Sequence, residues 1–276
     1  MTVDRTRRRL LALGGSAAIA SLSGCTNATP FVGKRLESTD SYDVSSTEAL
    51  VVDTNGDVTV RPANGDRMRV RTVKQSGSVF ADVSEVTVNV TRDAGTLRID
   101  VQGQGNGSWL EGSTTVDVTV DLPDGVTLDT VRTVNGDVDV RRVAGDATLE
   151  TVNGDVSVRS LDGFFSAETT NGDVEARDVA GVESVTTTNG EVAIDVPAVR
   201  DAAAVETTNG DVAVAVSPDL NARLVATSDF DDVVVSGLSL DDSMRTEHLV
   251  EGDLGGGEGR LRIASTNGDV TVSKLD

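Results

Sequence analysis

The sequence has little of the chemistry on which most enzyme sites depend. It holds one cysteine, Cys25, and one histidine, His248, among its 276 residues. A single cysteine excludes a disulfide within the chain, and a single histidine excludes a metal site built from several imidazoles. A Ser-His-Asp triad would have to use His248, which lies in no nucleophile-elbow context. We therefore expect no catalytic residues and no enzyme.

Aromatic and lysine residues are scarce as well. Aromatic residues make up 3% of the chain, and three lysines stand against 21 arginines. The formal net charge is −21, which argues against nucleic acid as a partner, because phosphate contacts need a clustered basic surface. Composition rich in Asp and poor in Lys is typical of proteins from salt-accumulating halophiles, in which salt screens the repulsion between acidic groups. We expect a halophilic, acidic protein.

Residues 1–24 are typical of an export signal. Arg7 and Arg8 resemble the arginine pair of the twin-arginine motif, since one free position and then apolar residues follow them. The apolar stretch over residues 10–22 is shorter than the roughly 20 residues that a bilayer span needs. We therefore predict a twin-arginine-type signal peptide.

The end of this apolar stretch resembles the lipobox of prokaryotic lipoproteins, in which the cysteine accepts the lipid. The matching residues are Leu22, Ser23, Gly24 and Cys25. The alternative is a plain signal peptide with an incidental cysteine after it. We expect lipidation of Cys25 and anchoring to the outer face of the cell membrane, and we expect residues 25–47, which lack hydrophobic periodicity, to be a flexible tether.

What the chain has in abundance is a repeat. The motif Asn-Gly-Asp/Glu-Val begins at Asn55, Asn135, Asn153, Asn171, Asn189, Asn209 and Asn267. From Asn135 to Asn209 the steps are 18, 18, 18 and 20 residues, and a degenerate copy follows at Thr227. Self-similarity at this period is typical of stacked supersecondary units.

Within each unit, aliphatic residues alternate with polar ones. Val138 and Val140 flank Asp139, and the same pattern returns at Val156 and Val158. Period-two alternation predicts strands with the aliphatic side chains inward. Asn and Gly suit the turns between these strands because both residues tolerate positive φ. The pattern predicts an all-β fold, namely a parallel β-solenoid of 18–20-residue coils; the alternative is an antiparallel β meander in which every Asn-Gly closes a hairpin.

The region before the regular repeat differs. Residues 48–129 contain strand-like runs without the 18-residue period, and we expect them to form an antiparallel β cap on a solenoid of residues 130–276. Residues 61–66, which contain Pro and Asn-Gly between two strand-like runs, predict a hairpin.

A strand that ends in Leu122-Pro123-Asp124-Gly125-Val126, followed by repeated Thr-Val/Thr-Asn-Gly-Asp-Val units, resembles the bacterial and archaeal putative-adhesin family of unknown function, domain of unknown function 4097. The resemblance covers residues 48–276. It implies a β-solenoid body and a surface or adhesive role, and that family has no established catalytic residues.

Two charged ladders follow from parallel stacking. The acidic one is Asp137, Asp155, Asp173, Glu191 and Asp211. Carboxylates about 4.8 Å apart repel one another, and a hard cation such as Ca²⁺ would relieve the repulsion. We favour the alternative, in which the aspartates serve turn geometry and solubility, so that no metal or cofactor is needed. The basic ladder is Arg141, Arg159 and Arg177. It would either hold a polyanionic glycan or pair with neighbouring acidic side chains, and we favour the pairing.

The sequence thus predicts a cell-surface lipoprotein that binds a glycan or a protein ligand and has no catalytic activity. The first alternative is a structural scaffold of the cell envelope that self-associates end to end. A more distant alternative is a β-helix enzyme acting on polysaccharides.

Overall fold

The computed structural model describes residues 33–44, 49–78, 82–102 and 114–276. All of them belong to one compact unit, Val32–Asp276. The expected signal peptide, Cys25 and the first part of the expected tether therefore lie outside the described residues. No helix long and apolar enough to cross a bilayer is found in the described part of the chain.

The described residues form 21 strands and no helix. The N-terminal third holds β1 (Lys34–Asp43), β2 (Ala49–Asp53), β3 (Val58–Pro62), β4 (Arg67–Ser76), β5 (Thr87–Asp93), β6 (Thr96–Gln102) and β7 (Thr115–Leu122). The regular repeats form β8 (Thr127–Arg132), β9 (Val138–Ala144), β10 (Ala147–Glu150), β11 (Val156–Glu168), β12 (Val174–Asn189), β13 (Val192–Val196), β14 (Ala202–Asn209) and β15 (Val212–Val216). The C-terminal part holds β16 (Ala222–Ser228), β17 (Val233–Val235), β18 (Asp241–Arg245), β19 (Leu249–Leu254), β20 (Gly259–Asn267) and β21 (Val270–Lys274).

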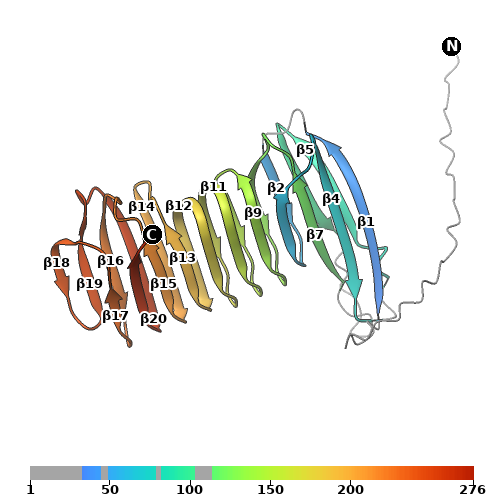
Figure 1. The fold of residues 1–276 in the computed structure, drawn as a ribbon. Coiled ribbons are helices and arrows are strands. Elements are labelled where there is room, and N and C mark those ends of the chain that lie inside the picture. The colour runs from blue at the N-terminus through green and yellow to red at the C-terminus, as the bar shows by residue number, and fades with distance from the viewer. Residues whose placement is uncertain (1–32, 45–48, 79–81, 103–113) are drawn as a thin grey trace, which may run out of the picture. The chain divides into compact units, whose positions relative to one another are not determined.

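Successive repeats pair in parallel, which confirms the predicted solenoid. Val156 lies opposite Val138 on one side and Val174 on the other, and the pairing follows the sequence repeat of 18 residues. The antiparallel meander is wrong, because in a meander each repeat would pair with the next in the opposite direction. Figure 1 shows the coils side by side along the stack.

Each coil contributes to two rows of strands. The strands before the Asn-Gly turns form the first row, and the strands after these turns form the second row. The long strands β11 and β12 run from the second row into the first, so that one end of β11 pairs with β9 and the other with β10. All 21 strands are therefore parts of one hydrogen-bonded sheet.

The order of coils in the stack departs from the order in the chain at both ends. The coil β2–β3 pairs with β6–β7 on one side and with β8–β9 on the other. At the other end, the last coil, β20–β21, lies between β14–β15 and β16–β17. The C-terminus consequently lies within the stack and not at its end (Figure 1).

Antiparallel strands lie at both ends of the stack. At the N-terminal end they are β1, β4 and β5, which pair antiparallel with their neighbours. Of the region 48–129 that was expected to form an antiparallel cap, β2 and β3 belong to the parallel stack instead. At the C-terminal end, β19 and β18 add antiparallel to β16, which the repeat did not predict.

Two expectations for the N-terminal region are wrong. Residues Lys34–Asp43 form β1 and not a tether; almost all of β1 is exposed, so it lacks the aliphatic alternation that marks a buried strand. Residues 61–66 do not close a hairpin, because β7 lies between β3 and β4, parallel to the first and antiparallel to the second. The residues of a turn do not reveal that a strand from elsewhere in the chain lies between the two strands that the turn connects.

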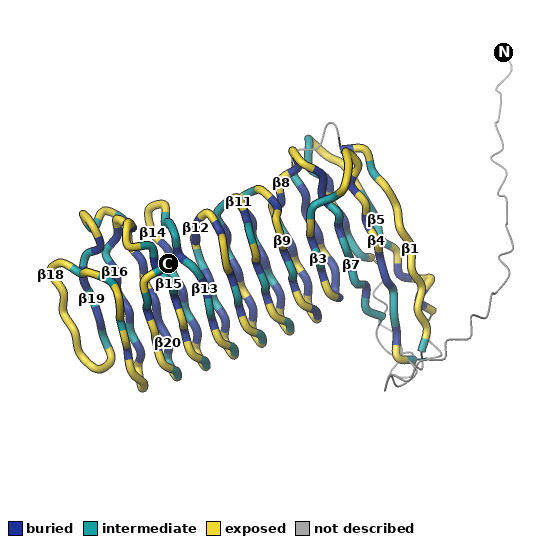
Figure 2. The backbone as a smooth tube through the Cα atoms, viewed as in Figure 1, coloured by how far each residue is buried: buried dark blue, intermediate teal, exposed yellow. Residues whose placement is uncertain are grey.

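The core is a column of aliphatic side chains between the two rows. Val58, Val138, Val158 and Val205 have no exposed surface, and Phe165 is the largest of the fully buried side chains. Figure 2 shows buried and exposed residues alternating along the coils. Because one coil cannot bury its aliphatic face alone, each stabilises the next.

Candidate functional site

One side of the stack carries the repeated turns, which we call the turn edge. It comprises the segments Thr/Ser-X-Asn-Gly-Asp/Glu at residues 133–137, 151–155, 169–173, 187–191, 207–211 and 265–269. Asn135, Asn153, Asn171 and Asn189 are joined by parallel bridges from coil to coil. Equivalent residues therefore lie one above another, about 4.8 Å apart.

The asparagine side chains form a continuous amide ladder. Each Nδ2 donates to the Oδ1 of the preceding coil in the stack, over 2.9–3.0 Å, along the series Asn135, Asn153, Asn171, Asn189, Asn209 and Asn267. Asn55 departs from the series, because it is buried and faces β7. Its Nδ2 donates to the Thr114 carbonyl and its Oδ1 accepts from the Val116 N–H.

The glycines are required by close approach between coils. A Cβ on Gly154 or Gly172 would overlap with the carbonyl of the glycine one coil before it, and the same holds at Gly136, Gly190, Gly210 and Gly268. Only Gly210 and Gly268 of this series have positive φ, and none of the ladder asparagines has. The expectation that these turns need positive φ is therefore wrong for most of them; the constraint is steric.

The first residue of each turn is a buried hydroxyl. Thr133, Thr151, Thr169, Thr187, Thr207 and Ser265 are at most 5% exposed. Their Oγ atoms donate over 2.7–3.1 Å to the glycine carbonyl of the neighbouring coil. A buried carbonyl without a partner is costly, so each hydroxyl stabilises the contact between two coils.

The acidic residues of the turn edge accept hydrogen bonds from the backbone. The Oδ1 of Asp137 accepts from the Asp155 N–H (2.9 Å), and that of Asp155 accepts from the Asp173 N–H (2.8 Å). The same contact runs from Glu191 to Asp173 and from Asp269 to Asp211. These contacts give the aspartates a structural role in the turns.

The predicted cation ladder, Asp137, Asp155, Asp173, Glu191 and Asp211, stands in this row. The described residues contain no group of three or more His, Cys, Asp or Glu side chains that could hold a metal ion. One oxygen of Asp137, Asp155, Asp173 and Asp211 is already used by a backbone N–H.

Glu191 interrupts the row. Within the residues that the structure describes, no bond joins the Asp211 N–H to Glu191, whose carboxylate is one methylene further from the backbone. We expect Glu191→Asp to restore the contact and to raise the free energy of unfolding by about 0.5–1.5 kcal/mol in urea denaturation. The matched control is Glu168→Asp, at an exposed strand position, with no expected gain. Equal effects of the two changes would contradict the structural role of the row.

The second residue of the first five of these six turns points to solvent. Val134, Val152, Thr170, Thr188 and Thr208 are all exposed, and Val134 and Val152 retain 46% and 42% of their surface. One such side chain stands on each of these five coils, on a backbone held by the amide, hydroxyl and carboxylate ladders. Binding at this surface would cost little conformational entropy, because the ladders already hold its backbone in place.

The basic ladder lies on the second row and is paired. Arg141 bonds Asp139 on its own strand, Arg159 pairs with Glu175 (2.6 Å) and Arg177 with Asp195 (3.3 Å). All three arginines remain about half exposed, so each pair contributes little to stability.

Asp117 of β7 is partly buried at the first step of the carboxylate row. Its Oδ1 accepts from the Asp57 N–H (3.2 Å) and its Oδ2 from the Gln75 amide (3.0 Å). Burial raises the pKa of Asp117; the Asp57 N–H opposes this shift, and repulsion from the Asp57 carboxylate adds to it.

A raised pKa means that the folded protein binds this proton more tightly than the unfolded chain, so stability falls as the pH rises through the pKa of Asp117. We expect Asp117→Asn to raise the urea midpoint at pH 7 and to leave it unchanged at about pH 3, where the carboxyl is protonated. Asp124→Asn, in an exposed turn, serves as the control. A gain that is equal at both pH values would contradict this account.

His248 contacts the backbone of a neighbouring turn. It is exposed, and its Nδ1 donates to the Asp231 carbonyl (2.7 Å) in the turn before β17. Leu22, Ser23, Gly24, Cys25, Arg7 and Arg8 lie outside the described residues, so the lipidation and export signals stay predictions.

The geometry is that of a repetitive β-solenoid, and residues 165–273 match the family described as Toastrack DUF4097. The resemblance to the putative-adhesin family is thereby confirmed over this segment, which includes the turns from Thr169 to Asp269. No curated protein matches the sequence.

Several solved structures are similar over most of their length. A putative cell adhesion protein from Clostridium sporogenes is 11% identical, with 88% of this chain and 100% of that chain covered and a TM-score of 0.40. A putative adhesin from Bacteroides fragilis is 10% identical, with 87% and 97% covered and a TM-score of 0.40. A putative lipid binding protein from Parabacteroides distasonis is 12% identical, with 87% and 97% covered and a TM-score of 0.39. At these TM-scores the likeness carries no argument about function.

Proposed function

We propose that the chain is a cell-surface lipoprotein that acts as a binding or adhesive module and has no catalytic activity. The observation that carries the proposal is the turn edge. It presents one exposed side chain per coil at a constant spacing, on a backbone held by three hydrogen-bonded ladders. A regular, preordered surface suits a ligand that is itself extended and repetitive, because many weak contacts form at once without ordering the protein.

A glycan array in molar KCl tests the binding function. We expect the full chain to bind extended saccharides and the change of Thr170, Thr188 and Thr208 to Lys to reduce that binding. These side chains point to solvent, so the variant keeps its fold, which circular dichroism would check. A folded variant that binds as well as the wild type would exclude the turn edge as the binding surface.

The membrane anchor is part of the same proposal and is tested separately. We expect the protein from cells to partition into the detergent phase and the Cys25→Ser variant to stay in the aqueous phase or the medium. Covalent lipid contributes about 0.8 kcal/mol per buried methylene, which a serine cannot carry. Equal partitioning of the two proteins would indicate a plain signal peptide instead.

End-to-end self-association is the second candidate, and the ends of the stack favour it. Strands β1, β5, β17 and β18 each pair with one neighbour only among the described strands. Phe230, just before β17, and Val234, on β17, are 70% and 53% exposed. Open strand edges are templates for pairing with a second copy. Sedimentation of the full chain decides, since filaments favour a scaffold and a monomer favours a binding module.

A further inference from the structure

The charge of the protein is distributed unevenly along the stack. Up to Gln102, the described residues hold nine basic and ten acidic side chains, whereas residues 114–276 hold eleven basic and 32 acidic ones. Nearly the whole excess of negative charge therefore lies on β7 and the coils after it, and the N-terminal end is close to neutral.

Arginines gather on the outer face of the second row at this end. Arg69 of β4 lies opposite Asp121 of β7, which lies opposite Arg61 of β3. The pairing of Val60 with Val140 places Arg61 beside Arg141, where the predicted basic ladder begins. Five arginines and one aspartate thus stand on adjacent strands.

The start of this row opens into a hollow of about 470 Å³, which we call the arginine hollow. Its charged lining is Arg61, Arg67, Arg69, Arg142 and Asp121, and the rest is Pro62, Ala63 and Asn64. Four guanidinium groups therefore face a single carboxylate. Arg61 and Arg69 share that carboxylate at 2.7 and 3.6 Å and keep 55% and 60% of their side-chain surface exposed.

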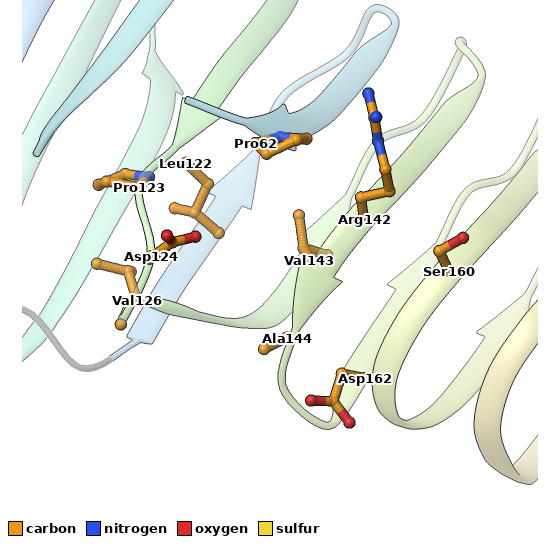
Figure 3. Close-up of a pocket in the computed structure, with 11 residues that line it drawn as sticks. Pro62, Leu122, Pro123, Asp124, Val126, Arg142, Val143, Ala144, Ser160 and Asp162 are labelled. Carbon is orange, nitrogen blue, oxygen red and sulfur yellow. The ribbon is translucent and has the colours of Figure 1, made fainter. Parts of the chain in front are cut away.

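The other two guanidinium groups form no ion pair with an acidic side chain in the part of the chain that the structure describes. Arg67 donates to the Ser41 carbonyl (3.0 Å). Arg142 forms no hydrogen bond or ion pair with the described residues, and it stands at a corner where its φ is 51°. Figure 3 shows its side chain extending from the strand beside Pro62. Asp124 and Asp162 line a neighbouring hollow of about 290 Å³, to which Arg142 also contributes.

We propose that the arginine hollow binds a tetrahedral oxyanion, the sulfate or phosphate group of an ester. The planar guanidinium fork donates two parallel hydrogen bonds to such oxygens, and an excess of three positive charges matches a doubly charged group better than a carboxylate. The inference rests on the proposed binding function and names its ligand chemistry. The arginine row that continues from the hollow would meet further negative groups of an extended ligand.

Calorimetric titration of the full chain with inorganic sulfate and inorganic phosphate, at constant KCl, tests the proposal. We expect saturable binding of at least one anion. The anion that binds more tightly indicates whether the natural ligand carries a sulfate or a phosphate ester. Arg142→Gln should weaken it about tenfold or more, since it removes a charge-assisted hydrogen bond, whereas Asp121→Asn should tighten it. Arg262→Gln, at an arginine that pairs with Glu206 outside the hollow and the arginine row, should change nothing.

No saturable binding of either anion overturns the proposal, as does an Arg142→Gln variant that binds like the wild type. Both results leave the proposed function intact if the glycan array still shows binding that depends on the turn edge. If the protein binds the anion but no glycan on the array, the proposal that the turn edge binds ligand is overturned, and the proposal for the arginine hollow is supported.

Discussion

Gly172→Ala is expected to lower the free energy of unfolding by about 1–3 kcal/mol, although it adds a single methyl group. The new Cβ would overlap with the Gly154 carbonyl of the preceding coil. The backbone cannot withdraw, because the Gly172 N–H donates to the Asn189 carbonyl (3.0 Å) and the Gly154 N–H to the Asn171 carbonyl (3.0 Å). Relief of the overlap would therefore break contacts on both sides of the coil. Urea denaturation followed by circular dichroism measures the loss.

Gly77→Ala is the matched control. A Cβ at Gly77 meets nothing within 4 Å, and the residue does not have positive φ. We expect a change within about 0.5 kcal/mol, as for other surface substitutions. Similar losses at Gly77 and Gly172 would mean that glycine flexibility, and not the close approach of coils, is what matters at the turn edge.

Phe165→Ala is expected to cost about 3–5 kcal/mol, the largest effect of any change considered for this protein. Phe165 has no exposed surface, and it lies on β11 between Ala147 of β10 and Val182 of β12. Truncation would leave a cavity in the core. The surrounding strands could not move in to fill it, because parallel pairing fixes their backbones. Chemical denaturation at constant salt measures the loss.

Phe230→Ala makes the same chemical change at a side chain that is 70% exposed. We expect little loss of stability there, and a reduced tendency to self-associate if the ends of the stack pair with one another. A Phe165→Ala variant that is as stable as Phe230→Ala would argue against a core continuous through this coil.

The repeat in the sequence was sufficient to predict the coil and its inward face. Val138, Val156, Val174 and Val192 recur at a fixed distance from the asparagine, and parallel stacking is the arrangement that places all of them in one core column. The order of the coils could not be predicted in the same way. Each coil offers nearly the same surface to its neighbours, so the position of β20–β21 next to β14–β15 depends on small differences in packing that a motif does not record.

The same reason explains which candidate sites could be predicted from the sequence. The sequence located the turn edge, because its residues are contiguous within each repeat. It gave the wrong reason for the glycines, since contact with another coil is not visible in local composition. The arginine hollow was missed because its guanidinium groups come from β3, β4 and β9. The available signal was the alternation of Arg67, Arg69 and Arg71 on one strand in an otherwise acidic chain.

The placement of the last coil inside the stack sets the order in which the protein can be assembled. The outer edge of β14 has no partner until β20 arrives, and β16 docks on β20 and not on β14. Coils that emerge first from the ribosome can stack on one another in the order of the chain. Strands β16–β19 can join the stack only after β20–β21, which follow them in the chain, so this part of the fold cannot form in the order of synthesis.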